Sequence, residues 1–266
     1  MINYLHKKWP YSILGVLSVF FIGMFLLIMP YAGYCSSIKQ NLLSSHLKPY
    51  QASYTLSWNG VKVGKSDHSL KKLAPRVFVA KSISKPFISW LPFNSFEKTE
   101  FMLRESGDSI VPLNYEYKIQ EKKREKKGKI LFKQQEQKII WIDEKNGAAT
   151  KEDKLPPLAQ DKISVYFQLR KDLKNLDPLK EKGPLTYVVV EPNKIKTYIF
   201  KITGSERLKT PLGTLDTLTL QHISDNQERF TKFWVAKDYD YLIVKLQQFK
   251  KGKLTGETMI QSITGL

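Results

Sequence analysis

The sequence predicts a mainly β protein with one helix in its body and an apolar helix at its N-terminus. Stretches that alternate apolar and polar side chains recur from residue 47 to residue 263, and turn residues separate them. Only residues 161–174 repeat their apolar side chains at helical spacing instead. Asp161 stands at the start of that stretch and can cap the helix.

The predicted strands are short, and the turns between them have recognisable chemistry. Asn59-Gly60 is the strongest hairpin signal in the chain. In Thr210-Pro211-Leu212-Gly213 the proline pre-sets φ and the glycine accepts a positive φ. The strands are expected at residues 47–58, 61–73, 76–83, 97–104, 110–120, 130–133, 138–143, 186–190, 196–203, 214–221, 230–236, 241–249 and 254–263.

Two segments between these strands have an unusual composition. Residues 86–96, PFISWLPFNSF, hold four aromatic residues and no charge. They form either a loop folded onto the core or an exposed apolar lip, and a lip would favour contact with lipid. Residues 121–129 are a basic hairpin tip, which is either a solvated turn or a surface for anions and membranes. The cations of that candidate surface are Lys122, Lys123, Arg124, Lys126 and Lys127.

The N-terminus carries an export signal. Lys7 and Lys8 precede residues 13–29, which are almost entirely apolar and long enough for a helix of about 25 Å. The segment is either a signal peptide cleaved at about residues 35–37 or an uncleaved signal anchor. We therefore expect a signal peptide or transmembrane anchor at 1–37, a linker at 38–47 and an exported mainly β domain at 48–266. That domain would lie in the periplasm or be anchored in the inner membrane and face the periplasm.

The chain is strongly basic, with 43 Lys and Arg against 25 Asp and Glu and a formal charge of +18. This excess is either a lysine-rich solvated surface or a surface for an anionic partner such as lipid headgroups. Nucleic acid is not expected as a partner, because export removes the chain from the cytoplasm. Cys35 is the only cysteine, which excludes an intrachain disulfide and a multi-cysteine zinc site. The oligomeric state stays open.

Short motifs run through the chain in a recognisable order. They are Ala52-x-Tyr54, Gly60-x-x-x-Gly64, Leu155-Pro156, Asp161-x-x-Ser164, Gly204-x-Glu206-x-Leu208, Thr210-Pro211-Leu212-Gly213, Phe233-Trp234 and the strand at residues 241–245. With these motifs, residues 48–264 resemble a family of exported bacterial proteins, the domain of unknown function 3108. The resemblance implies a curved antiparallel sheet or partly open β-barrel and no established activity. The lysine excess and the long apolar N-terminus depart from a plainer member and favour a role at a membrane surface.

Catalytic signatures are missing from the sequence. The four histidines do not fall at metal-binding spacings, and the chain has no nucleophile elbow, phosphate loop or dinucleotide fingerprint. We therefore predict a protein that is not an enzyme and needs neither metal nor cofactor. The alternative is an enzyme acting on cell-envelope material, with acid–base work by acidic residues such as Glu97, Glu100 and Asp161.

The aromatic residues of the strands indicate what a non-catalytic protein of this kind binds. A partly closed curved sheet leaves a concave apolar face, and small ligands bind in such places. The candidate ligand-binding residues are Tyr54, Trp58, Phe233 and Trp234. The alternative role for these aromatics is to fill the core. The predicted partners are a lipid or other amphipathic ligand and the membrane surface.

Overall fold

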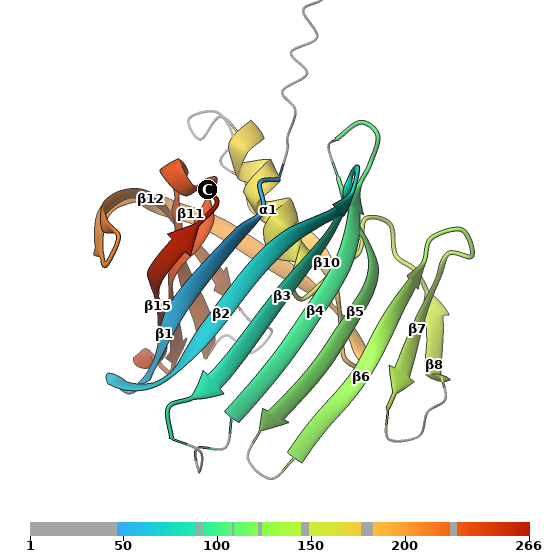
Figure 1. Ribbon diagram of the computed structural model, residues 1–266, viewed down its shortest axis with the longest axis horizontal. Helices are drawn as coiled ribbons and strands as arrows, with labels where there is room; N and C mark the ends of the chain where they lie inside the picture. The colour runs from blue at the N-terminus through green and yellow to red at the C-terminus, as the bar shows by residue number, and fades with distance from the viewer. Residues whose placement is uncertain are drawn as a thin grey trace, which may run out of the picture. The chain divides into compact units, whose positions relative to one another are not determined.

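The structure, a computed structural model, describes residues 47–88, 91, 93–107, 109–121, 124–144, 149–176, 183–223 and 228–266 (Figure 1). The predicted N-terminal helix and Cys35 lie outside the described residues. Within the described part of the chain, no helix has the length and apolar character needed to cross a bilayer.

The described chain consists almost entirely of strands. In chain order the elements are β1 (Tyr50–Trp58), β2 (Val61–Ala74), β3 (Val77–Pro86), β4 (Phe93–Leu103), β5 (Ile110–Glu121), β6 (Arg124–Lys133), β7 (Lys138–Asp143), β8 (Ala149–Lys154), β9 (Gln160–Asp161), α1 (Ser164–Asn175), β10 (Leu185–Glu191), β11 (Lys194–Thr210), β12 (Gly213–Ile223), β13 (Arg229–Ala236), the 3₁₀ turn η1 (Lys237–Tyr239), β14 (Leu242–Lys250) and β15 (Lys253–Thr264).

All these strands belong to one sheet in the order β8-β7-β6-β5-β4-β3-β2-β1-β15-β14-β13-β12-β11-β10-β9. Strands that follow each other in the chain are mostly neighbours, and the last strand, β15, pairs antiparallel with the first, β1. The short β9 pairs parallel with β10 at one edge, and β8 forms the other edge. The prediction of a mainly β, antiparallel fold with one helix is confirmed.

The Asn59-Gly60 turn has the backbone that its sequence predicts. Asn59 has φ 46° and Gly60 has φ 82°. Two positive φ values define the type I′ turn, whose twist matches that of the strands it joins. Local chemistry alone therefore positions the β1–β2 hairpin.

The sheet curves so that its two halves approach each other. Trp141 of β7 packs in the same buried cluster as Val190 of β10. The indole N–H of Trp141 donates a hydrogen bond to the backbone carbonyl of Glu191, with 2.9 Å between nitrogen and oxygen. Side chains, not a strand ladder, make this contact, because β8 and β9 are the open edges of the sheet. The result is the partly open barrel that the family resemblance implies.

Helix α1 packs between the two halves of the sheet, close to one end of the strands in Figure 1. Its residues Val165, Leu169 and Leu173 join a buried cluster made largely by β10–β13. Its Phe167 contacts Phe101 of β4, with ring centroids 5.1 Å apart. The helix starts at Ser164, three residues later than the spacing predicts.

The basic run at residues 121–129 is mostly strand. Residues 122 and 123 lie outside the described residues, whereas Lys126 and Lys127 belong to the β5–β6 ladder. Lys127 forms an ion pair with Glu144. Lys129 of β6 pairs with Glu116 of β5 at 3.2 Å. Opposite charges on neighbouring strands favour pairing, which explains why the strand extends further than its lysine content suggests.

Candidate functional site

A cavity of about 890 Å³ lies on the curved sheet. It is lined by the last residues of β1, β12 and β14 and the first residues of β2, β11, β13 and β15. These segments meet at one end of the strands, where the β1–β2 and β14–β15 hairpins turn. The cavity is therefore formed where strand ends converge and not by any one motif in the sequence.

Apolar and aromatic side chains form much of the cavity wall. Phe230 of β13 lies directly opposite Phe249 of β14, and their rings stack with centroids 4.6 Å apart. The apolar and aromatic lining residues are Leu56, Trp58, Val63, Phe93, Tyr198, Phe230, Leu246 and Phe249. Such a wall can hold a hydrocarbon or ring system out of water.

Polar and charged groups share the same wall. The charged or titratable lining residues are Glu191, Lys196, His222, Arg229, Lys250 and Glu257. Hydroxyl and amide groups of Thr231, Gln248 and Thr258 stand among them. The site is amphipathic, with cations in the majority.

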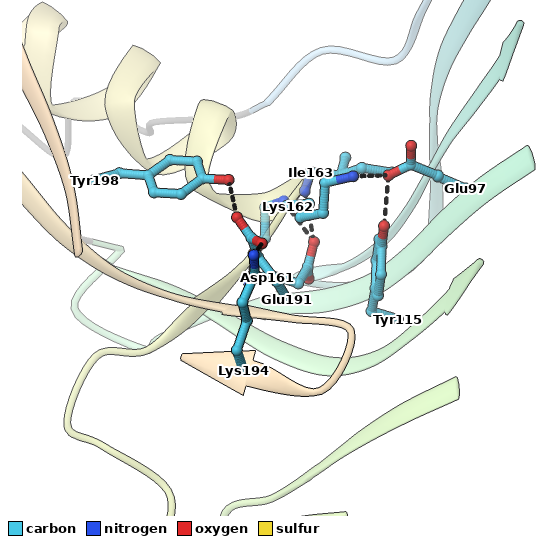
Figure 2. Close-up of polar contacts among 9 residues, drawn as sticks. Glu97, Tyr115, Asp161, Lys162, Ile163, Glu191, Lys194 and Tyr198 are labelled. Carbon is cyan, nitrogen blue, oxygen red and sulfur yellow. Dashed lines mark hydrogen bonds and ion pairs between the residues drawn. The ribbon is translucent and has the colours of Figure 1, made fainter. Parts of the chain in front are cut away.

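One group of hydrogen bonds organises the Glu191 side of the cavity (Figure 2). The Tyr198 hydroxyl donates to the Glu191 carboxylate at 2.6 Å, and Lys194 forms an ion pair with that carboxylate at 3.3 Å. Burial first, and then the neighbouring Tyr166 and Glu191, raise the pKa of Tyr198. Tyr198 is therefore a protonated donor that fixes the carboxylate and does not act as a base.

A second carboxylate, Glu97 of β4, is held in the same way (Figure 2). The Tyr115 hydroxyl donates to it at 2.5 Å, and Lys162 forms an ion pair with it at 3.4 Å. Burial, followed by Glu97 and Glu191, raises the pKa of Tyr166 to about 12. Tyr166 is therefore protonated at neutral pH.

His68 of β2 adds a neutral imidazole to this interior. Its ring lies 4.7 Å from that of Tyr54, and its Nε2 is 3.0 Å from the Ser66 hydroxyl. Burial lowers the pKa of His68 to about 4, against the opposing effects of Glu97 and Asp67. The histidine is uncharged at neutral pH.

The three acidic residues of the enzymatic alternative lie in different surroundings. Asp161 is fully buried and accepts hydrogen bonds from the Ile163 and Ser164 amides at 2.8 and 2.9 Å, so it holds the start of α1. Glu100 forms an ion pair with Lys98 at 3.0 Å. Because side chains alternate along β4, Glu100 faces away from Glu97.

The four predicted ligand-binding aromatics are not brought together. Trp58 lines the cavity, whereas Tyr54 is buried and donates a hydrogen bond to the Ile243 carbonyl at 2.9 Å. Phe233 packs in the cluster around α1. Trp234 packs in a different cluster, and its indole N–H donates to Glu206. Tyr54, Phe233 and Trp234 are therefore core residues and do not line the cavity.

Sequence reasoning missed the residues that form most of the wall. The sequence pattern places Phe230 and Phe249 in strands without indicating a site, and it marks neither Tyr198 nor Glu191. Glu191, Phe230 and Phe249 share one signal, a position at or next to the end of a strand, whereas Tyr198 lies further inside β11. That signal becomes specific only once the pairing register is known.

The described residues include no group of three or more His, Cys, Asp or Glu side chains placed to hold a metal ion.

No protein of curated function matches the chain. Several solved structures resemble it at low sequence identity, among them the three that follow. A β-barrel-like DUF1849 protein from Brucella abortus has a TM-score of 0.51 and 8% identity, covering 82% of this chain and 98% of its own.

Two further structures are less similar. A candidate lipoprotein from Parabacteroides distasonis has a TM-score of 0.35 and 10% identity, covering 82% of this chain and 96% of its own. A candidate exported protein from Bacteroides fragilis has a TM-score of 0.34 and 9% identity, covering 82% and 97%. The Brucella protein shares the general fold. The family of proteins of unknown function DUF3108 matches residues 53–257, and the chain belongs to this family.

Proposed function

We propose that this protein is a non-catalytic protein of the bacterial cell envelope that binds an amphipathic ligand in the cavity. The observation that carries the proposal is the composition of the cavity wall. Stacked aromatic rings, Phe230 on Phe249, stand beside cations such as Arg229 and Lys250 in one hollow. An amphipathic molecule offers each part of this wall a matching group.

The size of the cavity agrees with this proposal. Pockets for small ligands have volumes of roughly 300–1,000 Å³ and combine apolar walls with a few polar groups. The cavity, at about 890 Å³, falls within that range. Its lining cations, Lys196, Arg229 and Lys250, favour a ligand with an anionic head.

The inner carboxylates support binding over acid–base chemistry. Glu97 and Glu191 are each held by one tyrosine hydroxyl and one lysine ammonium group. A carboxylate held by these hydrogen bonds and ion pairs is fixed in place. Because Glu191 lines the cavity, its bonds to Tyr198 and Lys194 maintain the shape of the cavity wall.

The proposed location follows from the N-terminal sequence. Residues 1–37 act as signal peptide or anchor, and residues 48–266 function outside the inner membrane. Intact-mass measurement of the protein from membrane and soluble fractions tests this location. Loss of about 35–37 residues identifies cleavage, a full-length mass in the membrane identifies an anchor, and a full-length mass in the cytosol contradicts export.

The binding proposal is tested by blocking the cavity. Thr258 lines it, so Thr258→Trp places an indole inside. Thr55 of β1 lies between Tyr54 and the cavity residue Leu56, and its side chain points to the opposite face. Thr55→Trp is therefore the matched control.

Each protein is produced as the full chain in bacteria, recovered as the cells process it, and extracted with organic solvent for mass spectrometry. We expect the wild type and Thr55→Trp to carry the same amphipathic compound. Thr258→Trp should carry at least about fivefold less of this compound, because the indole occupies volume that the compound would fill. An empty wild-type extract, or equal loading of all three proteins, would contradict the proposal.

A further inference from the structure

We propose that the open end of the sheet is a docking rim that seats on an anionic lipid bilayer, so that the cavity opens onto the membrane surface. The rim is defined as five exposed apolar side chains, Trp58, Val61, Phe87, Ile88 and Leu254. The proposal extends the proposed function, because it places the cavity mouth at a source or acceptor of amphipathic molecules. It is nevertheless tested separately.

The rim residues come from three turns that the structure brings side by side. The Asn59 amide donates to the Thr255 carbonyl at 3.2 Å, which joins the β1–β2 turn to β15. The Phe87 amide donates to the Val63 carbonyl at 2.9 Å, which joins the end of β3 to β2. Apolar residues from separate hairpins therefore form one neighbourhood.

The rim is continuous with the cavity. Trp58 lines the cavity and is 54% exposed, so one side chain belongs to both surfaces. Phe93 follows the Phe87–Ile88 segment and lines the cavity from the other side. Of the two alternatives for residues 86–96, the exposed lip therefore describes Phe87 and Ile88, while Phe93 turns inward; residues 89, 90 and 92 lie outside the described residues.

Exposed lysines surround these apolar groups and identify the partner as anionic. Lys62 follows Val61, Lys85 precedes the Phe87 segment, and Lys250 and Lys253 flank the β14–β15 turn. In the described part of the chain these four lysines form no ion pair, although Lys251 pairs with Glu228 at 3.6 Å. Exposed aromatic and aliphatic groups ringed by unpaired cations match the headgroup region of an anionic bilayer.

The described part of the predicted basic segment, at the start of β6, lies at the same end of the sheet. In Figure 1 the end of β5 and the start of β6 lie at the lower edge, as the β1–β2 turn does. Lys127 forms an ion pair with Glu144, so its charge is not available as an unpaired cation. The attraction to an anionic bilayer therefore comes mainly from Lys62, Lys85, Lys250 and Lys253.

The experiment compares two positions on one strand. Val61 and Leu73 are both exposed apolar residues of β2, at 65% and 58%, but they lie at opposite ends about 40 Å apart. An environment-sensitive fluorophore is attached through Val61→Cys or Leu73→Cys in the full chain carrying Cys35→Ser. Each protein is reconstituted in phosphatidylcholine vesicles with or without phosphatidylglycerol, and quenching by nitroxide-labelled lipid is measured.

We expect the Val61→Cys fluorophore to shift to the blue and to be quenched in the anionic vesicles, and the Leu73→Cys fluorophore to be unaffected. Lys250→Glu with Lys253→Glu should reduce the docked fraction, because each lysine removed weakens docking about fivefold at low salt. Phe87→Ser with Ile88→Ser should also reduce quenching. Leu254→Cys provides a second rim position if the label at residue 61 disturbs the hairpin.

Three results would overturn the docking rim. These are no quenching at residue 61, equal quenching at residues 61 and 73, and a blue shift that needs no lipid and disappears on dilution. Equal quenching means that the N-terminal segment merely holds the domain near the bilayer, and a dilution-sensitive shift means that a second copy covers the rim. Solvent extracts of the same samples report cavity occupancy, so failure to bind ligand and failure to dock are distinguished.

Discussion

The indole nitrogen of Trp141 in β7 lies 2.9 Å from the backbone carbonyl oxygen of Glu191 in β10, and this hydrogen bond ties the two halves of the sheet together. The same Glu191 directs its carboxylate to Tyr198 at the cavity. The contact that closes the curved sheet therefore also positions part of the cavity wall. Buried side chains around Trp141 replace the strand pairing that the open edges lack.

Trp141→Phe tests this closure. The substitution removes the donor to Glu191 and leaves a small cavity in a buried cluster, so we expect a loss of about 2–4 kcal/mol in unfolding free energy. Trp58→Phe, at an exposed position, should change it by no more than about 0.5 kcal/mol. Urea unfolding measures the unfolding free energy of both variants. If Trp141→Phe lost as little stability as Trp58→Phe, Trp141 would not hold the two halves of the sheet together.

Asp240→Asn tests how α1 is attached to the sheet. Asp240 accepts a hydrogen bond from the buried Arg170 at 3.0 Å and forms an ion pair with Lys174. Asparagine tolerates the positive φ of 59° at this position but removes the charge, so we expect a loss of about 2–4 kcal/mol. Asp216→Asn, which breaks the exposed pair with Arg207, should cost less than about 1 kcal/mol. Thermal and urea unfolding measure both variants. Equal losses of stability for Asp240→Asn and Asp216→Asn would contradict the anchoring role of Asp240.

Gly64→Ala tests a close approach that shapes the cavity. A Cβ at Gly64 would lie 2.9 Å from the Phe93 ring and would also meet the Lys85 carbonyl oxygen. The ring or the strand must move, and we expect a loss of about 1–3 kcal/mol together with weaker ligand retention. Gly183→Ala meets no atom within 4 Å and should be neutral. Unchanged stability of Gly64→Ala would show that Phe93 adjusts freely.

His68 should make stability depend on pH between about 6.5 and 4. Its folded-state pKa of about 4 lies below the unfolded value, so the unfolded chain binds the extra proton first as the pH falls. Stability is therefore full above pH ~6.5 and declines towards pH ~4, by up to about 3 kcal/mol. His68→Gln removes the part of this pH dependence that comes from the imidazole.

The pH prediction is measured as the difference between the two proteins. Urea unfolding of wild type and His68→Gln is compared across that range, so that other titrating groups such as Asp161 cancel. The wild type should lose more stability than the variant on acidification. Parallel curves for the two proteins would show that the imidazole is not desolvated in the folded state.

Local chemistry made much of the fold predictable. The hairpin at Asn59-Gly60 follows from two residues that accept positive φ, and the helix that begins at Ser164 follows from apolar spacing and the Asp161 cap. The strand at residues 124–129 could not be predicted in the same way. Its lysines pair with acidic residues on neighbouring strands, and single-sequence patterns do not reveal cross-strand neighbours.

The sequence does not identify which aromatic residues line the cavity. The sequence indicated aromatic side chains on a concave sheet, and Trp58 lines the cavity. Phe233 and Trp234 are adjacent on β13 and enter different buried clusters, because successive side chains of a strand point to opposite faces. Which aromatic residues reach the cavity depends on curvature and register.

By itself the sequence determined the β composition, the single helix of the body, the turn chemistry and the family, since these depend on residues near one another in the chain. Only the tertiary structure decided that Trp141 meets Glu191, that Phe230 stacks on Phe249, and that the five apolar residues of the docking rim gather at one end. These are contacts between distant segments. The energy of each depends on how the whole sheet bends, and no local pattern encodes that bend.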